Sequence, residues 1–213
     1  MTPNSTLATL TLSETIKMPC KSWSVSALAC KTGSKLAQVS GSVCFGCYAL
    51  KGFYRMSNVA STLHKRLSLM AEKGWAKAMV AKIKAEEHSG FFRWFDSGDI
   101  QSLQNLKDIV RIAIALPEVQ FWLPTKEYGI VSEYFELYGP FPKNLTVRLS
   151  AYMVDKAGPN SLARDLGLTT SEVHSEASVP VGFACPSSKQ GNKCLDCRAC
   201  WSSKVQTISY RLH

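Results

Sequence analysis

The stretch that decides the fold is "FFRWFDSGDIQSLQNLKDIVRIAIALPEVQFWLPTK", residues 91–126. It opens with an aromatic run over residues 91–98 that is typical of a buried strand. Residues 100–116 repeat apolar side chains at helical spacing, and residues 119–126 form a second apolar run. A strand, a helix and a strand joined by short loops predict a parallel pair connected by a right-handed crossover.

The same alternation continues along the chain. Residues 127–139 predict a second helix, and residues 144–152 predict a third strand. We therefore expect an α/β protein, and we favour a partial or distorted parallel β/α barrel over an open doubly wound sheet. In either fold, ligands bind at the C-terminal ends of the strands. Residues 96–99, 125–126 and 150–152 and Cys185 are expected there.

The N-terminal flank has a weaker pattern. Residues 15–56 are rich in Ser, Gly and Lys, which predicts loops and a short helix near residues 47–51. Residues 57–88 predict one or two amphipathic helices, with a break at Gly74 and a cap at Ser57 or Asn58.

On the C-terminal flank, residues 156–178 suggest an irregular excursion, residues 179–186 a fourth strand and residues 204–213 a last strand. We expect a single domain over residues 1–213. Its parts are a cysteine-rich N-terminal segment (15–56), a helical and β/α core (57–155) and a cysteine-rich C-terminal segment with the final strand (181–213).

The charge is unevenly distributed. The net charge is +9, and residues 1–56 carry six Lys and Arg against one acidic residue. A basic surface favours anionic partners, including nucleic acid, although lysines can also offset the charge of thiolate-bound clusters. No apolar run is long enough to span a membrane, and the N-terminus lacks a secretory pattern. We expect a cytoplasmic protein without a membrane partner, located in the host cytoplasm if it is phage-encoded.

Four of the eight cysteines lie in "CPSSKQGNKCLDCRACW", residues 185–201. Their spacing is C-x8-C-x2-C-x2-C, and thiolates separated by two residues can turn toward one centre. Bacterial ferredoxin-type clusters use such spacings, and the same four ligands can hold tetrahedral zinc. The consecutive x2 spacings favour a [4Fe–4S] cluster over zinc, with redox thiols or structural cysteines as further alternatives. The four residues are Cys185, Cys194, Cys197 and Cys200.

The other four cysteines lie within the first 47 residues. Cys44 and Cys47 form a C-x2-C pair, Cys30 is a candidate third ligand, and Cys20 is either a fourth ligand or a bystander. Three thiolates would leave one iron open to a substrate, whereas four would make the cluster an electron relay or a structural staple. A thioredoxin-like redox pair is a further alternative. Whether the two cysteine groups share one site, and whether one or two clusters are bound, stays open.

These motifs carry a family resemblance. Their order resembles the bacteriophage "gene product eighty-eight" family over nearly the whole chain. The resemblance implies a phage or prophage protein and a kinship with radical S-adenosylmethionine proteins, which have a partial β/α barrel and a cluster on three closely spaced cysteines. That superfamily uses C-x3-C-x2-C, but position 40 here is Ser, which argues against S-adenosylmethionine and leaves Cys30 as a remote third ligand. The motifs are "KMPCKSWSVSALACKTGSKLAQVSGSVCFGCYALKGFY" (17–54), "RWFDSGDI" (93–100), "FWLPTK" (121–126), "RLS" (148–150) and "CPSSKQGNKCLDCRACW" (185–201).

Three charged residues are candidates for catalytic roles. Asp96 lies at a strand end, where it can bind a substrate, and Asp99 is expected to cap the following helix. Lys126 follows the second strand, and Arg148 lies inside the third. At inward-facing positions either cation needs a partner, such as Asp96, an anionic substrate or a cluster. The alternative for Lys126 is a side chain that extends to solvent.

We therefore expect an iron–sulfur protein, with [4Fe–4S] as the cofactor and zinc as the alternative. An open iron would make it an oxidoreductase, lyase or desulfurase that uses a small-molecule substrate and an electron donor. The rival function is a zinc-stapled basic protein that binds nucleic acid or a host partner without catalysis. A third is a cluster protein with a structural or redox-sensing role.

Overall fold

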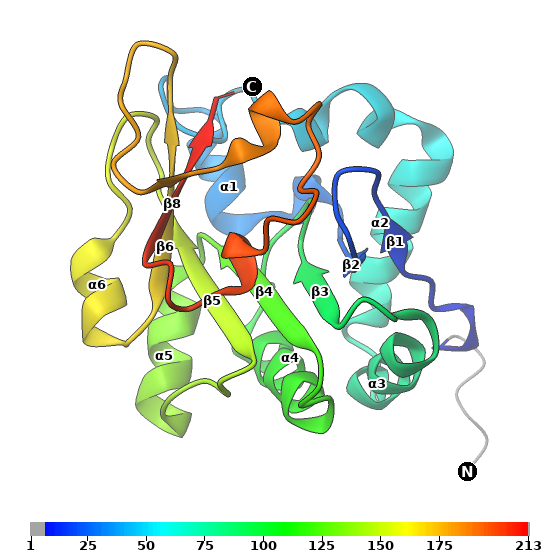
Figure 1. Cartoon of the computed structure of the whole chain (residues 1–213). Coiled ribbons are helices and arrows are strands. Elements are labelled where there is room, and N and C mark those ends of the chain that lie inside the picture. The colour runs from blue at the N-terminus through cyan, green and yellow to red at the C-terminus, as the bar shows by residue number, and fades with distance from the viewer. Residues whose placement is uncertain (1–6, 213) are drawn as a thin grey trace.

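The computed structural model describes residues 7–212 and centres on an eight-stranded, mostly parallel sheet (Figure 1). The strand order is β1-β2-β3-β4-β5-β6-β8-β7; β1 is antiparallel to β2, and the other pairs are parallel. The α/β prediction is confirmed. The strands are β1 Ser13–Glu14, β2 Lys21–Trp23, β3 Phe91–Trp94, β4 Gln120–Thr125, β5 Leu145–Ser150, β6 Thr169–His174, β7 Phe183–Ala184 and β8 Thr207–Arg211.

The α-helices and short 3₁₀ helices connect these strands. No helix within residues 7–212 has the length and apolar content to cross a membrane. The α-helices are α1 Lys31–Leu36, α2 Ser57–Leu69, α3 Trp75–Glu86, α4 Leu103–Ala115, α5 Tyr128–Tyr138 and α6 Asn160–Asp165. The 3₁₀ helices are η1 Leu7–Thr9, η2 Ala27–Ala29, η3 Tyr48–Leu50, η4 Gly52–Arg55, η5 Pro186–Lys189 and η6 Ala199–Trp201.

Helix boundaries follow local signals, with two departures from the predicted caps. Gly74 separates α2 from α3 as predicted, and its φ of 94° is a conformation that glycine adopts readily. The predicted cap at Ser57 or Asn58 is wrong, because Met56 occupies the N-cap of α2. Asp99 does not cap α4, because the Ser102 side chain accepts the Asn105 N–H instead.

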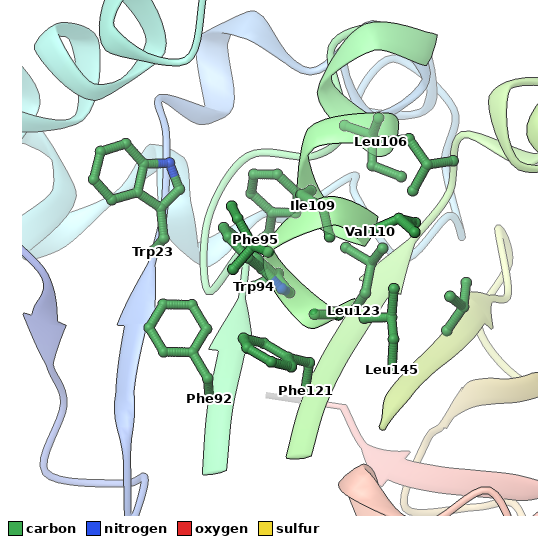
Figure 2. Close-up of a cluster of buried hydrophobic side chains, with 14 of the residues drawn as sticks. Trp23, Phe92, Trp94, Phe95, Leu106, Ile109, Val110, Phe121, Leu123 and Leu145 are labelled. Atoms are coloured by element: carbon green, nitrogen blue, oxygen red, sulfur yellow. The ribbon is translucent and has the colours of Figure 1, made fainter. Parts of the chain in front are cut away.

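The main core lies between the sheet and helices α3 to α5. Alternation along β3 sends Phe92 and Trp94 to this side, where Trp94 stacks on Phe121 of β4. Ile109 of α4 packs into the same cluster (Figure 2). Each such fully buried side chain contributes roughly 1.5–3 kcal/mol.

The opposite face of the sheet is covered by the C-terminal segment. Helix η6 packs on β4 and β5, and the orange-to-red chain crosses in front of the sheet in Figure 1. The Trp201 ring lies 5.4 Å from Trp122 and 5.5 Å from Phe91, and its Nε1 donates to the Phe92 carbonyl. The cysteine-rich C-terminal segment is therefore built into the sheet face.

Two segments differ from the sequence prediction. The predicted excursion over residues 156–178 contains α6 and the regular strand β6, which pairs with β5 and β8. The predicted strand over residues 179–186 is reduced to two residues, Phe183–Ala184. Polar residues in β6 hid its alternation, because Thr170 pairs with Thr207 through hydroxyls rather than apolar contact. Strands β1 and β2 were also not predicted, because each is only two or three residues long.

Candidate functional site

The carboxyl ends of β3 and β4 are joined through Asp99. Its carboxylate accepts hydrogen bonds from Thr125 Oγ1 at 2.6 Å, the Lys126 N–H at 2.8 Å and the Ile100 N–H at 2.8 Å. Burial raises the pKa of Asp99 to about 6, and these hydrogen bonds oppose the shift. Asp99 therefore fixes the strand ends that the sequence assigned to the candidate site.

Three of the N-terminal cysteines lie near one another and near Asp99 at these strand ends. A Cβ placed on Gly33 would lie 3.0 Å from Cys30 Cβ, 3.5 Å from Cys30 Sγ and 3.7 Å from Cys44 Sγ. Burial raises the pKa of Cys30 to about 12, and the charges of Asp99, Cys47 and Cys44 act in the same direction. Cys30, Cys44 and Cys47 therefore form one group, which we call the three-thiol site, and Gly33 leaves space beside its sulfur atoms.

The three-thiol site is held to the sheet by polar contacts from the β4–α5 connection. The Thr32 N–H and hydroxyl donate to the two Glu127 carboxylate oxygens, each at 2.9 Å. The Val43 N–H donates to the Tyr152 carbonyl, and the Tyr152 hydroxyl donates to the Lys126 carbonyl. These contacts fix both chain segments that carry the thiols.

Lys126 lies close to this site. Burial raises the pKa of Cys44, and the positive charge of Lys126 opposes that shift, as it also does at Cys30. A cation here would favour an anionic ligand beside the thiols. Of the three charged candidates named from the sequence, Lys126 is the one next to the N-terminal cysteines.

The remaining five cysteines form a second group, the five-thiol site, on the sheet face under the C-terminal segment. Cys20 is buried in the same apolar cluster as Cys200, with Cys185 packed against it. Burial raises the pKa of Cys194, and the charges of Cys185 and Cys197 act in the same direction. The sequence groups Cys20 with the N-terminal cysteines, whereas the structure places it beside Cys194.

The polypeptide reaches this arrangement by pairing its two ends. The Cys194 N–H donates to the Lys17 carbonyl at 2.9 Å, and Cys194 Sγ lies 3.9 Å from Met18 Sδ. The Cys185 N–H donates to the Ser209 carbonyl of β8 at 2.9 Å. The short strands β1 and β2 hold residues 17–20 where the C-terminal cysteines can meet them.

Arg148 is fully buried beside the five-thiol site. Its guanidinium donates to five main-chain carbonyls, at 2.9–3.5 Å, and burial lowers its pKa. Because every donor group faces a carbonyl, Arg148 holds the C-terminal loop in place in this structure. The carbonyls belong to Thr170, Ala199, Cys200, Ser202 and Gln206.

Asp96 is likewise engaged inside the protein. Its carboxylate accepts from Ser22 Oγ at 2.6 Å and Ser24 Oγ at 3.0 Å, and it pairs with Arg93 at 3.1 Å. Arg93 also lies over the Trp122 ring, 4.5 Å from its centroid. Asp96 therefore positions Arg93. Sequence reasoning missed Arg93, although a lone cation in an aromatic strand was the available signal.

The thiols themselves are free. None of the eight cysteines forms a disulfide, and burial raises the pKa of Cys20, Cys30, Cys44, Cys194 and Cys200. Raised thiol pKa values oppose nucleophilic or dithiol redox chemistry, which needs the thiolate. Within residues 7–212, no three His, Cys, Asp or Glu side chains are close enough together to hold a metal as they stand. Metal binding would therefore require the thiols to rotate toward one another.

Comparison with known proteins gives a family and no activity. A family model described as Gene product 88 matches residues 2–203. No curated protein and no solved structure matches the chain.

Proposed function

This chain belongs to the gene product 88 family, and we propose from its own residues that it is an iron–sulfur protein with two thiolate-ligated sites. The first uses Cys30, Cys44 and Cys47. The second uses Cys185, Cys194, Cys197 and Cys200, with Cys20 beside them. We further propose that the sheet is a partial β/α barrel and that the protein is phage-encoded and acts in the host cytoplasm.

The observation that carries this proposal is the pair of cations beside the five-thiol site. Arg148 is 0% exposed, and the Arg93 side chain is 14% exposed. Arg93 is paired with Asp96, but within residues 7–212 Arg148 has only carbonyl partners. An isolated buried charge is costly unless an anion lies nearby. Cys200 and Tyr210 are the ionisable groups whose charge would stabilise Arg148.

A metal bound by cysteines would place negative charge beside the buried guanidinium of Arg148. Coordination deprotonates a thiol outright, so it would replace neutral thiols by anionic ligands beside Arg148 and Arg93. This charge argument fits a thiolate-bound metal in general. The C-x2-C-x2-C run of Cys194, Cys197 and Cys200 favours a cubane cluster over zinc.

The three-thiol site supports a catalytic role. It offers three thiols, whereas a cubane has four irons, so one iron would keep an open position for a small-molecule substrate. Bound there, such an iron would supply electron transfer or Lewis-acid chemistry, and Cys30, Cys44 and Cys47 would hold it. Lys126 would attract an anionic group, and the ring of Tyr128, stacked on Tyr152 at 4.5 Å, forms a rigid wall near the same strand ends. We propose an oxidoreductase, lyase or desulfurase with a separate electron donor.

S-adenosylmethionine is not part of the proposal. The chain has Ser40 where a radical S-adenosylmethionine motif has its first cysteine, and Ser40 is exposed. Cys30 comes instead from the N-cap position of α1. The third thiol is thus supplied by a separate segment, and the C-x3-C-x2-C loop is not formed.

The test is metal analysis of the full chain purified without oxygen. We expect a brown protein with about eight irons and matching sulfide, four irons in each cubane. Cys44→Ser and Cys197→Ser should each remove about half of the iron, because they belong to different sites. Cys20→Ser is the matched control and should leave the iron content near that of the wild type, because four other cysteines remain beside it. A colourless protein with zinc and no sulfide would overturn the proposal.

A further inference from the structure

A long N-terminal stretch of the chain has no acidic residue. Residues 15–71 contain eight Lys and Arg and no Asp or Glu. Five of these side chains are exposed, and within residues 7–212 none of the five pairs with a carboxylate: Lys31, Lys35, Lys51, Arg55 and Lys65. Unneutralised positive charge of this extent favours an anionic partner.

Exposed aromatic rings lie in the same stretch. Phe53 is 79% exposed, Phe45 is 58% exposed and Tyr48 is 50% exposed. The Tyr48 hydroxyl donates to the Asp96 carbonyl, and its ring meets Tyr54 edge-on at 5.7 Å. The buried hydroxyl and the half-exposed ring make Tyr48 a fixed platform rather than a mobile side chain.

Structural contacts bring these groups onto one surface. A Cβ on Gly46 would lie 3.7 Å from Lys51 Nζ, which places this cation beside the turn that carries Phe45. Helix η3 packs against η2 and η4, and η4 packs against α2. In Figure 1 the arrows of the parallel strands β2 to β8 point toward the upper part of the view, where α1 and the light-blue segment after it lie. We call Lys31, Lys35, Phe45, Tyr48, Lys51, Phe53 and Arg55 the basic aromatic patch.

We propose that the basic aromatic patch binds single-stranded nucleic acid. Cations that follow a phosphate backbone, combined with rings on which bases stack, are the features of sequence-tolerant single-strand binding. Tyr48 and Phe53 lie in 3₁₀ helices, Phe45 lies in the turn before them, and α1 has only six residues. The patch therefore lacks the long exposed helix that reads a duplex major groove. The proposal does not rest on the metal sites, although Phe45 follows Cys44 and Tyr48 follows Cys47 in the chain.

The experiment is fluorescence polarisation of the full chain, purified without oxygen, with labelled 20-nucleotide single-stranded RNA, single-stranded DNA and the matching duplex. We expect the single strands to bind more tightly than the duplex. The slope of log K against log salt should be about −3, because four phosphate contacts contribute about −0.7 each for a single strand. Iron is measured on the same samples, so failure of the metal proposal and failure of this one are seen separately.

Variants assign the binding to the patch. Phe53→Ala should weaken single-strand binding about tenfold, the loss expected for one stacked base. Tyr138→Ala, which removes a 49%-exposed ring on α5, should change it less than twofold. Lys51→Gln should make the salt slope shallower by about 0.7, whereas Lys143→Gln should leave it unchanged.

Three results would overturn the proposal. The first is the absence of salt-dependent binding to either single strand. The second is a duplex affinity equal to the single-strand affinity. The third is an equal loss of single-strand affinity in Phe53→Ala and Tyr138→Ala. Vesicles containing anionic lipid form a further arm: retention on them that Phe53→Ala abolishes, without oligonucleotide binding, would assign the patch to a membrane surface instead.

Discussion

Replacing Arg148 by methionine tests the most heavily bonded side chain in the structure. Met has a comparable stem but no donors, so five carbonyls would each lose a hydrogen bond, although those of Ala199, Ser202 and Gln206 would keep a main-chain donor. An unsatisfied buried acceptor costs roughly 1–3 kcal/mol. Removal of the buried cation and partial relaxation offset part of this sum, which leaves a loss of about 3–5 kcal/mol. For a chain of this length, we expect Tm to fall by roughly 10 °C.

Thermal and urea unfolding of the protein measure this loss, with metal analysis on the same samples. Iron at the five-thiol site should fall with stability, because three of the five carbonyls belong to residues 199–202, which include Cys200. Arg111→Met is the matched control: its side chain is 61% exposed and contacts Asp108, so the change should be within about 0.5 kcal/mol. An Arg148→Met protein with unchanged Tm and full iron would refute the positioning role.

Three further variants test the local geometry. Gly33→Val should halve the iron content, because the valine side chain would fill the space beside Cys30 and Cys44, and circular dichroism should show that the protein stays folded. The control is Gly129→Ala, whose Cβ meets nothing within 4 Å and which should leave the iron content unchanged. Gly98→Ala should lower the free energy of unfolding in urea by about 2 kcal/mol or more, because φ is 81° and the new Cβ would lie 2.8 Å from the Val25 carbonyl. Glu127→Ala should reduce iron at the three-thiol site several-fold, because it removes the two hydrogen bonds that hold Thr32 of α1. Glu133→Ala changes an exposed residue of α5 and should leave the iron content unchanged. Equal iron in both variants would contradict this role of Glu127.

The centre of the fold could be predicted because its periodicity is strong. Residues 91–150 alternate between apolar strands and amphipathic helices, and the structure follows them closely. Strand β6 could not be predicted, because Thr169, Thr170 and Ser171 are buried through hydroxyl contacts that leave no apolar signal. Strand β2 is too short for periodicity and exists through its parallel pairing with β3.

The candidate site was predictable in its ligand types but not in its grouping. Spacing along the chain puts Cys20 nearer to Cys30, and only the pairing of residue 17 with residue 194 shows that it belongs with the C-terminal thiols. The roles of Asp96 and Arg148 also depend on their partners. Each is a charged residue inside an apolar run. Sequence alone does not show whether such a side chain contacts a substrate, binds main-chain carbonyls as Arg148 does, or forms an internal ion pair as Asp96 does.

The Arg93–Asp96 pair lies close to the five-thiol site, because the charge of Arg93 acts on Cys20, Cys194 and Cys200. Burial lowers the pKa of Arg93, but the charges of Asp96, Tyr48, Tyr210 and Cys200 outweigh burial and raise it overall. Tyr48 follows Cys47 of the three-thiol site, whereas Cys200 belongs to the five-thiol site. Arg93 therefore interacts directly with Cys200, and an anionic ligand set at the five-thiol site would stabilise its charge. Because a charge interaction is mutual, Arg93 would in turn stabilise anionic ligands at the five-thiol site.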